Sequence, residues 1–261
     1  MKRTPITPDM NAIPAELHPF ISGCAVFDSS CSPNARVIFL ERDGGLYLKS
    51  AVAGSLKQEA EMDAYFASLG LGPEVLNYYS AEEDWLLTRA VRGEDCLHPD
   101  YLAEPERLAE IMAQMLYDLH HRDHSGCPVQ DHTARYLARA EENYQAGRYD
   151  ASLFPDNWGY ASAEEAWAVV EANARYLKTD TLLHGDYCLP NIMLDHWKPS
   201  GFIDVGGGGV GDRHVDLFWG AWTLNYNLKS EKYTQRFLDA YGRKNFQAEM
   251  LRVIAALEVF L

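Results

Sequence analysis

The sequence predicts an α+β protein with a small β-rich first part and a larger, mostly helical second part. Short runs rich in β-branched and aromatic residues occupy the first ninety or so positions. Longer segments with apolar residues three and four positions apart follow them. The 261 residues are 47% hydrophobic and 23% charged, a composition that can bury a substantial core and excludes a disordered or fibrous chain.

The β-rich part begins with two strand-like runs at residues 37–40 and 46–49, separated by a hairpin-type turn at residues 41–45. A third apolar run lies at residues 85–88. The polar stretch at residues 89–93 follows it and is the expected boundary between the two parts. The sequence therefore predicts lobes at residues 1–90 and 91–261.

One helix is expected inside the first lobe. Ser55 is the predicted N-cap, because a serine hydroxyl accepts a hydrogen bond from the first helical turn. The apolar positions Leu56, Ala60 and Ala64 are predicted to face the core, and the helix should stop near Gly70.

The second lobe shows clear helix signals. Pro105 follows Glu104 and suits the first turn of a helix. Ser162 and Glu165 form a capping-box pattern before a second helix at residues 166–177. The helical pattern returns after Val215. The apolar face of the first of these helices is formed by Leu108, Ile111, Met112, Met115, Leu116 and Leu119.

Charge and cysteine usage limit the classes of partner. A formal net charge of −15 argues against nucleic-acid and anionic-membrane binding, and it suits either a cationic partner or solubility alone. The five cysteines are odd in number and form no Cys-x-x-Cys pair, so reduced thiols are expected. No run resembles a signal peptide or a membrane span, and a cytoplasmic protein is expected.

The strongest chemical signal is the sequence HGDYCLPN at residues 184–191, followed by FIDVG at residues 202–206. Phosphoryl transfer needs a carboxylate that orients the attacking hydroxyl and oxygen ligands that hold Mg²⁺ on the phosphates. Asp186 can supply the first, and Asn191 and Asp204 can supply the second. Two unrelated turns, each with an Asp, would be the plain alternative, but their order and separation favour a kinase site.

These two motifs resemble the catalytic pair of the aminoglycoside phosphotransferases, in particular the kanamycin and neomycin kinases of the 3'-type. The resemblance covers nearly the whole chain. It implies a protein-kinase-like two-lobed fold, ATP with GTP as an open alternative, and Mg²⁺. It also implies that Asp186 is the catalytic aspartate, that Asn191 and Asp204 bind the metal, and that Asp216 is a buried structural aspartate below the catalytic loop.

The same resemblance assigns nucleotide-binding residues in the first lobe. Lys49 would contact the α- and β-phosphates and pair with Glu59 on the following helix, although a lysine that ends a strand is by itself usually a solvated edge residue. Tyr47 would stack against adenine. Ser32 matches a short phosphate-covering loop that lacks the glycines of protein kinases.

The hinge between the lobes would run through residues 88–91. Backbone groups of Arg89 and Val91 would then bond the adenine edge.

The resemblance places the cationic substrate near acidic residues, because aminoglycosides carry several ammonium groups. Asp156 matches an acidic position in the loop that covers the aminoglycoside, and Glu258 matches one in the terminal segment. Val259 replaces the second terminal acid, for which the carboxylate of Leu261 could compensate. Plain surface charges are the alternative for each.

Two departures leave the substrate open. Gly207 and Trp222 stand where the family usually or often has arginine. A kinase of the same fold acting on another small-molecule alcohol, choline-like or macrolide, is therefore the runner-up. A protein kinase would carry an Arg-Asp catalytic loop and a Gly-rich lid, which are missing here. The predicted oligomeric state is a monomer or weak dimer.

Overall fold

The computed structural model describes residues 3–149 and 159–261. The chain divides into two compact units. Unit 1 comprises Met1–Cys96 with Pro190–Gly206, and unit 2 comprises Leu97–Leu189 with Gly207–Leu261. The predicted division into lobes at residues 1–90 and 91–261 concerns which part binds the nucleotide and which part carries the catalytic residues. It stays a prediction.

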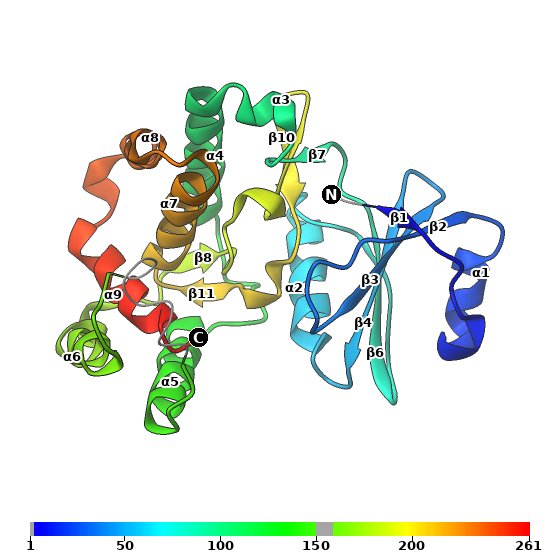
Figure 1. Ribbon diagram of the computed structural model, residues 1–261, viewed down its shortest axis with the longest axis horizontal. Coiled ribbons are helices and arrows are strands. Elements are labelled where there is room, and N and C mark those ends of the chain that lie inside the picture. Colours follow the sequence, from blue (N-terminus) through cyan, green and yellow to red (C-terminus); the bar gives the residue numbers. More distant parts are fainter. Residues whose placement is uncertain (1–2, 150–158) are drawn as a thin grey trace. The chain divides into compact units, whose positions relative to one another are not determined.

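Unit 1 contains a six-stranded antiparallel sheet in the order β1-β2-β3-β4-β6-β5 (Figure 1). The strand runs predicted at residues 37–40, 46–49 and 85–88 are confirmed as parts of β3, β4 and β6. Aliphatic side chains from one sheet face join Leu17 and Ile21 of the N-terminal turns in a buried core. The strands are β1 Thr4–Pro5, β2 Ala25–Asp28, β3 Arg36–Glu41, β4 Leu46–Val52, β5 Val75–Ser80 and β6 Glu83–Arg89. The turns are η1 Met10–Ala12, η2 Ala15–Leu17 and α1 His18–Ile21.

The helix of unit 1, α2 (Lys57–Ser68), begins differently from the prediction. Its N-cap is Leu56, and Ser55 instead donates its hydroxyl to the Val52 carbonyl at 2.6 Å. The Ser55 cap was therefore wrong. Ala64 is exposed, so it was also wrong as a core position. The helix ends at Leu69, close to the predicted stop.

A second, three-stranded sheet in unit 1 has the order β10-β9-β7. Its strands are β7 Glu94–Asp95, β9 Ile192–Asp195 and β10 Lys198–Phe202. Strands β9 and β10 pair antiparallel and form a hairpin. The hairpin β9–β10 also carries two of the predicted site residues at its open end.

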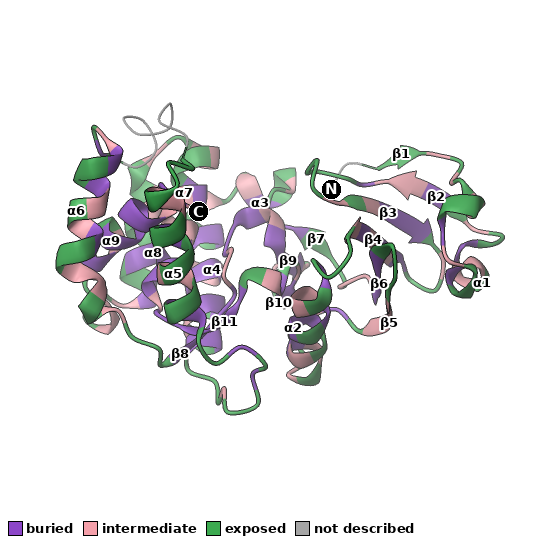
Figure 2. Ribbon diagram, turned by 90° about the horizontal axis from the view of Figure 1, so that it is seen from below, coloured by how far each residue is buried: buried purple, intermediate pink, exposed green. Residues whose placement is uncertain are grey.

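Unit 2 is mostly helical, as predicted, and buries the faces of its helices against one another (Figure 2). Helix α4 packs on α8, and α7 contacts both α8 and α9. Ser162 caps α6: its Oγ accepts the Glu165 N–H at 3.2 Å. The elements are α3 Pro99–Leu102, α4 Pro105–His120, α5 His132–Gln145, α6 Ala163–Asn173, η5 Ala174–Tyr176, β8 Thr181–Leu183, β11 Gly209–Gly211, α7 His214–Leu228, α8 Glu231–Tyr241, η8 Arg243–Asn245 and α9 Ala248–Glu258.

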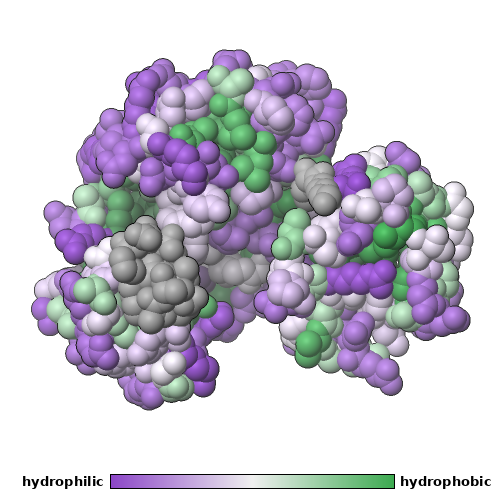
Figure 3. Space-filling model, in the orientation of Figure 1, coloured by the Kyte–Doolittle hydropathy of each residue, from purple (hydrophilic) through white to green (hydrophobic). Residues whose placement is uncertain are grey.

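The face seen in Figure 3 is mostly hydrophilic, with smaller apolar areas. Among the described residues no helix is both long and apolar enough to cross a membrane. The large hydrophobic side chains that are exposed within the described part are Val52, Leu97, Tyr149, Tyr176 and Tyr226.

Candidate active site

The β4–α2 pair of unit 1 builds a charged cluster around Lys49. The Lys49 Nζ lies 2.8 Å from both carboxylate oxygens of Glu59 and 3.0 Å from Oδ1 of Asp204. Burial favours a lower Lys49 pKa, but the charges of Asp204 and Glu59 outweigh it and raise the pKa above its usual value. Lys49 is therefore held as a cation, which is the form that binds phosphate.

Two oxygen donors lie together at the open end of the β9–β10 hairpin. Asn191 precedes β9, Asp204 follows β10 by one residue, and the Ile203 N–H donates to the Asn191 carbonyl at 3.0 Å. Asp204 adopts a left-handed φ of 59°, and its side chain is about half exposed. An amide and a carboxylate are hard oxygen ligands, so this donor pair fits Mg²⁺.

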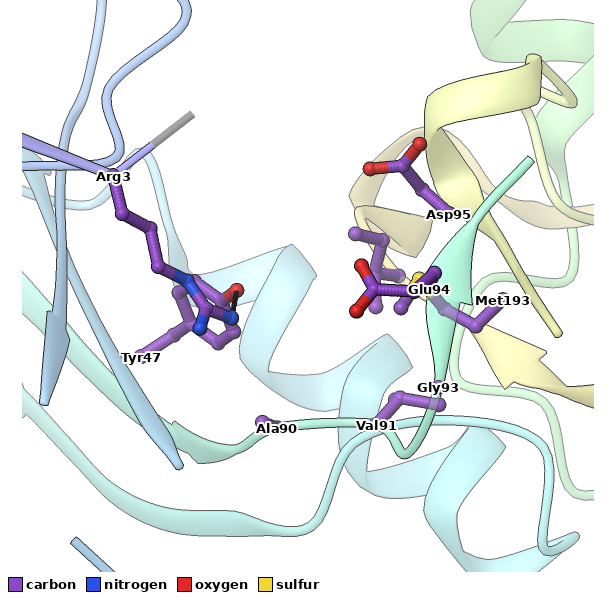
Figure 4. A pocket seen from close by; sticks show the side chains of 9 residues that line it. Arg3, Tyr47, Ala90, Val91, Gly93, Glu94, Asp95 and Met193 are labelled. Carbon is purple, nitrogen blue, oxygen red and sulfur yellow. Dashed lines mark hydrogen bonds between the residues drawn. The ribbon is translucent and has the colours of Figure 1, made fainter. Parts of the chain in front are cut away.

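A cavity of about 200 Å³ lies beside this cluster in unit 1 (Figure 4). Tyr47 of β4 and Val91 of the predicted hinge both line it. The full lining is Arg3, Tyr47, Ala90, Val91, Gly93, Glu94, Asp95, Met193 and Ile203. Aromatic, aliphatic and acidic side chains in one cavity suit a flat base with an attached sugar.

The other predicted nucleotide residues lie outside this lining. The backbone N–H of Arg89 donates to the Glu74 carbonyl at 2.9 Å, so only the Arg89 carbonyl could meet a base. Ser32 is exposed in the loop between β2 and β3, where its hydroxyl accepts the Asn34 N–H at 3.2 Å.

In unit 2 the loop that carries Asp186 is held in place by hydrogen bonds to the buried Asp216 and by the buried Tyr187. The buried Asp216 accepts the backbone N–H groups of His184 and Gly185, each at 2.8 Å. Its Oδ2 is also 3.1 Å from Nε2 of His120. Burial favours a higher Asp216 pKa, but the hydrogen bond and charge of His120, together with those of His184, keep the pKa below its usual value. Tyr187 is fully buried and donates its hydroxyl to the Met112 carbonyl at 2.7 Å. Asp186, between these anchors, is half-buried.

Gly185 is required by its surroundings. Its φ is +88°, and a Cβ built there would lie 2.1 Å from the Gly207 carbonyl oxygen. In the nearby glycine-rich segment, Val205–Gly207 form a 3₁₀ turn and Gly209–Gly211 form β11.

Glu258, at the end of α9, is held by two donors. Its Oε1 accepts the Tyr136 hydroxyl and the indole N–H of Trp219, the latter at 3.1 Å. Burial, helped by the nearby charge of Asp186, raises the pKa of Glu258 to about 7. The Leu261 N–H donates to the Glu258 carbonyl at 3.4 Å. Asp156 lies outside the described residues.

Residues 33–256 match the model of the "Phosphotransferase enzyme family". A Lactococcus lactis relative named "Probable aminoglycoside 3'-phosphotransferase" is 43% identical over 97% of this chain and 96% of its own length. The chain belongs to the aminoglycoside phosphotransferase family.

Solved structures of other family members agree with the fold. An aminoglycoside-3'-phosphotransferase of type VIII is 27% identical, with a TM-score of 0.75 over 94% of this chain and 97% of that one. A Streptomyces rimosus phosphotransferase, solved with ADP and streptomycin, is 22% identical with a TM-score of 0.71 over 86% of this chain and 90% of that one. The predicted α+β, protein-kinase-like fold is thus confirmed for this phosphotransferase.

The structure adds residues that sequence reasoning missed. Asp63, one helical turn after Glu59, is 3% exposed, and its Oδ1 has no hydrogen-bond partner within the described ranges. Burial, together with the negative charge of Glu59, raises the Asp63 pKa to about 8. The i, i+4 spacing of the two acids was a usable signal. Arg3 lines the cavity of unit 1, and no motif in the sequence pointed to it.

Proposed function

We propose that this phosphotransferase moves the γ-phosphoryl group of ATP to a hydroxyl of an aminoglycoside, namely the 3'-hydroxyl, and so confers resistance. The observation that carries the proposal is the Lys49–Glu59–Asp204 cluster beside a cavity that suits a nucleoside. The names of its relatives support the choice of acceptor.

In this mechanism most catalysis comes from positioning and charge. Lys49 contacts the α- and β-phosphates while Glu59 holds its ammonium group in place. Asn191 and Asp204 would hold Mg²⁺, which neutralises negative charge on the phosphates when it is bound. Asp186 orients the acceptor hydroxyl and accepts its proton.

The nucleoside part of ATP would occupy the cavity of unit 1. Tyr47 stacks on the base, the carbonyl of Arg89 and the backbone of Val91 bond its edge, and Ser32 covers the phosphates. Within the described residues no group hydrogen-bonds the N–H of Val91, which supports its role as a donor to the base.

The acceptor is proposed to bind unit 2 through its ammonium groups. Glu258 is the described acid that fits this role, because it lies within electrostatic reach of Asp186. Asp156 and the Leu261 carboxylate complete the proposed acidic set. We also propose that residues 1–90 form the nucleotide lobe and 91–261 the catalytic lobe of a cytoplasmic monomer or weak dimer.

A coupled ADP-release assay across an aminoglycoside panel tests the proposal. Turnover of kanamycin-like compounds is expected, whereas a 3'-deoxy aminoglycoside should bind without being phosphorylated. Asp186→Ala should lower kcat roughly 10²–10⁴-fold and leave nucleotide affinity nearly unchanged, because Asp186 addresses the hydroxyl.

Other outcomes would revise the proposal at different levels. An active Asp186→Ala variant would remove that residue from the mechanism, and phosphorylation of the 3'-deoxy compound would overturn the regiochemistry. Turnover of neutral alcohols alone would favour the runner-up substrate class, in agreement with Gly207 and Trp222 at positions where relatives often have arginine.

A further inference from the structure

The N-terminal arm of unit 1 brings an arginine to the base cavity. The guanidinium carbon of Arg3 lies 3.5 Å from the centroid of the Phe39 ring, and its Nη2 donates to the Tyr47 hydroxyl at 3.0 Å. Figure 4 shows the Arg3 side chain against Tyr47, across the cavity from Glu94 and Asp95. We propose that Arg3 is a nucleotide-positioning residue that holds the Tyr47 ring and forms one wall of the base and ribose site.

The backbone of the arm fixes the place of Arg3. The next two residues form β1, in which Thr4 pairs with Asp28 and Pro5 with Phe27 of β2. The Ile6 N–H also donates to the Val26 carbonyl at 3.0 Å. Because β1 is a paired strand of the sheet, the position of Arg3, the residue directly before it, is fixed.

The partner of Arg3 is an aromatic ladder that runs across three strands. Phe27 lies opposite Phe39, and Phe39 lies opposite Tyr47, in the register of β2, β3 and β4. The ring centroids are 6.2 Å and 5.1 Å apart. Arg3 covers the middle ring and bonds the hydroxyl of the last one, so it restricts the rotamers of the ring that meets the base.

Charge gives Arg3 a second effect on the same ligand. Of the described residues that line the cavity, Arg3 alone is cationic, whereas Glu94 and Asp95 are acidic. A nucleotide carries several negative charges, which those two acids repel. Arg3 offsets this repulsion from the opposite wall, while the N–H donors that do not bond the Tyr47 hydroxyl can address ribose or base acceptors.

The inference rests on the proposed use of a nucleoside triphosphate. It predicts that a change at Arg3 alters the binding of the nucleotide and not the binding of the acceptor. Arg3→Met keeps an apolar side chain of similar length but removes the charge and the donors. We expect the Kd for MgADP and the KM for MgATP to rise about 3- to 10-fold, with kcat and the acceptor KM changed less than about twofold. Arg3→Lys should recover part of the loss.

Tyr47→Phe separates two contributions of Arg3, namely its hydrogen bond to the Tyr47 hydroxyl and its own interaction with the nucleotide. It keeps the ring but removes the acceptor for Arg3. If Arg3 acts partly through Tyr47, the double variant Arg3→Met/Tyr47→Phe will weaken MgADP binding by less than the product of the two single effects. Arg42→Met is the matched control, since Arg42 lies in the turn directly after β3 of the same sheet but does not line the cavity, and it should leave MgADP affinity unchanged.

Calorimetry with MgADP on the full chain distinguishes the possible failures. If the unaltered protein binds no MgADP, the proposed function itself fails. If it binds MgADP and Arg3→Met binds equally well, the role of Arg3 is overturned. Equal weakening by Arg42→Met would also overturn it, because a general charge effect would then explain the result.

Discussion

Among single residues, Asp204 pairs with Lys49 and is also a proposed ligand of Mg²⁺. Its Oδ1 lies 3.0 Å from the Lys49 ammonium group, and its side chain is exposed enough to meet a metal ion. Its left-handed backbone is a conformation that aspartate tolerates better than most residues. Such conformations persist where the surrounding structure holds them in place, and here the hairpin β9–β10 does so.

Asp204→Ala should weaken MgADP binding roughly tenfold, because it removes one of the two proposed metal ligands. The measurement is nucleotide affinity as a function of Mg²⁺ concentration. Asp195→Ala is the matched control, since Asp195 lies at the turn end of the same hairpin and pairs with Arg92 and His196. An unchanged Mg²⁺ dependence in Asp204→Ala would exclude it as a ligand.

The proposed role of Glu258 in binding the acceptor predicts that substrate binding depends on pH near neutrality. With a pKa of about 7, its side chain is mainly neutral below pH 7 and becomes an anion above it. A cationic acceptor prefers the anion, so the acceptor KM should fall as the pH rises from about 6 to about 8. The ratio of KM in Glu258→Gln to KM in the unaltered enzyme should grow from near 1 to roughly fivefold.

The raised pKa of Glu258 also makes the free energy of unfolding depend on pH. This stability falls as the pH rises. Ionisation of Glu258 is easier in the unfolded chain, so the folded state loses stability as the pH rises from about 4.3 towards 7. Glu258→Gln should remove this part of the pH dependence in thermal unfolding. A KM ratio that stays constant with pH would show that the Glu258 charge does not contact the acceptor.

Among the elements, α2 depends on a distant strand for its N-terminus. Asp84 of β6 is fully buried and accepts the Leu56 N–H at 2.8 Å. It also accepts the hydroxyls of Tyr78 and Ser80 at 3.1 Å and 2.5 Å. The helix that carries Glu59 is therefore attached to the sheet by one carboxylate.

Asp84→Ala should lower the free energy of unfolding by about 2–3 kcal/mol, because it leaves the buried Leu56 N–H without its acceptor and also removes the part-buried hydrogen bonds from Tyr78 and Ser80. Ser55→Ala, at the cap position that the sequence suggested, should change stability by less than about 0.5 kcal/mol. Urea denaturation of both variants makes the comparison. Equal losses would contradict the assignment of Asp84 as the anchor of α2.

For the whole molecule, the net charge of −15 should help to capture a polycationic acceptor. Raising the salt from about 0.1 M to about 1 M shortens the screening length from about 10 Å to about 3 Å. The acceptor KM should therefore rise roughly threefold or more, with kcat little changed. An N-acetylated aminoglycoside with fewer ammonium groups should show a shallower dependence, and a flat response for both would argue against a cationic acceptor.

Much of the fold could be predicted because its signals are local. Strand runs, the capping Ser162 and the apolar stripe of α4 depend on residues a few positions apart, and the structure confirms them. The kinase motifs are local too, so Asp186, Asn191 and Asp204 stood out within about twenty residues of sequence. Their roles stay predictions.

The sequence alone thus determined the family and supplied the proposed catalytic and metal-binding residues, because compact motifs hold that information. Only the tertiary structure decided how those residues are supported. Arg3 meets Tyr47 across 44 positions, and Tyr136 meets Glu258 across 122. Such pairs depend on how strands and helices pack, and in the second pair burial also raises the pKa values of both groups. No local pattern records which distant side chain will exclude water from a given carboxylate.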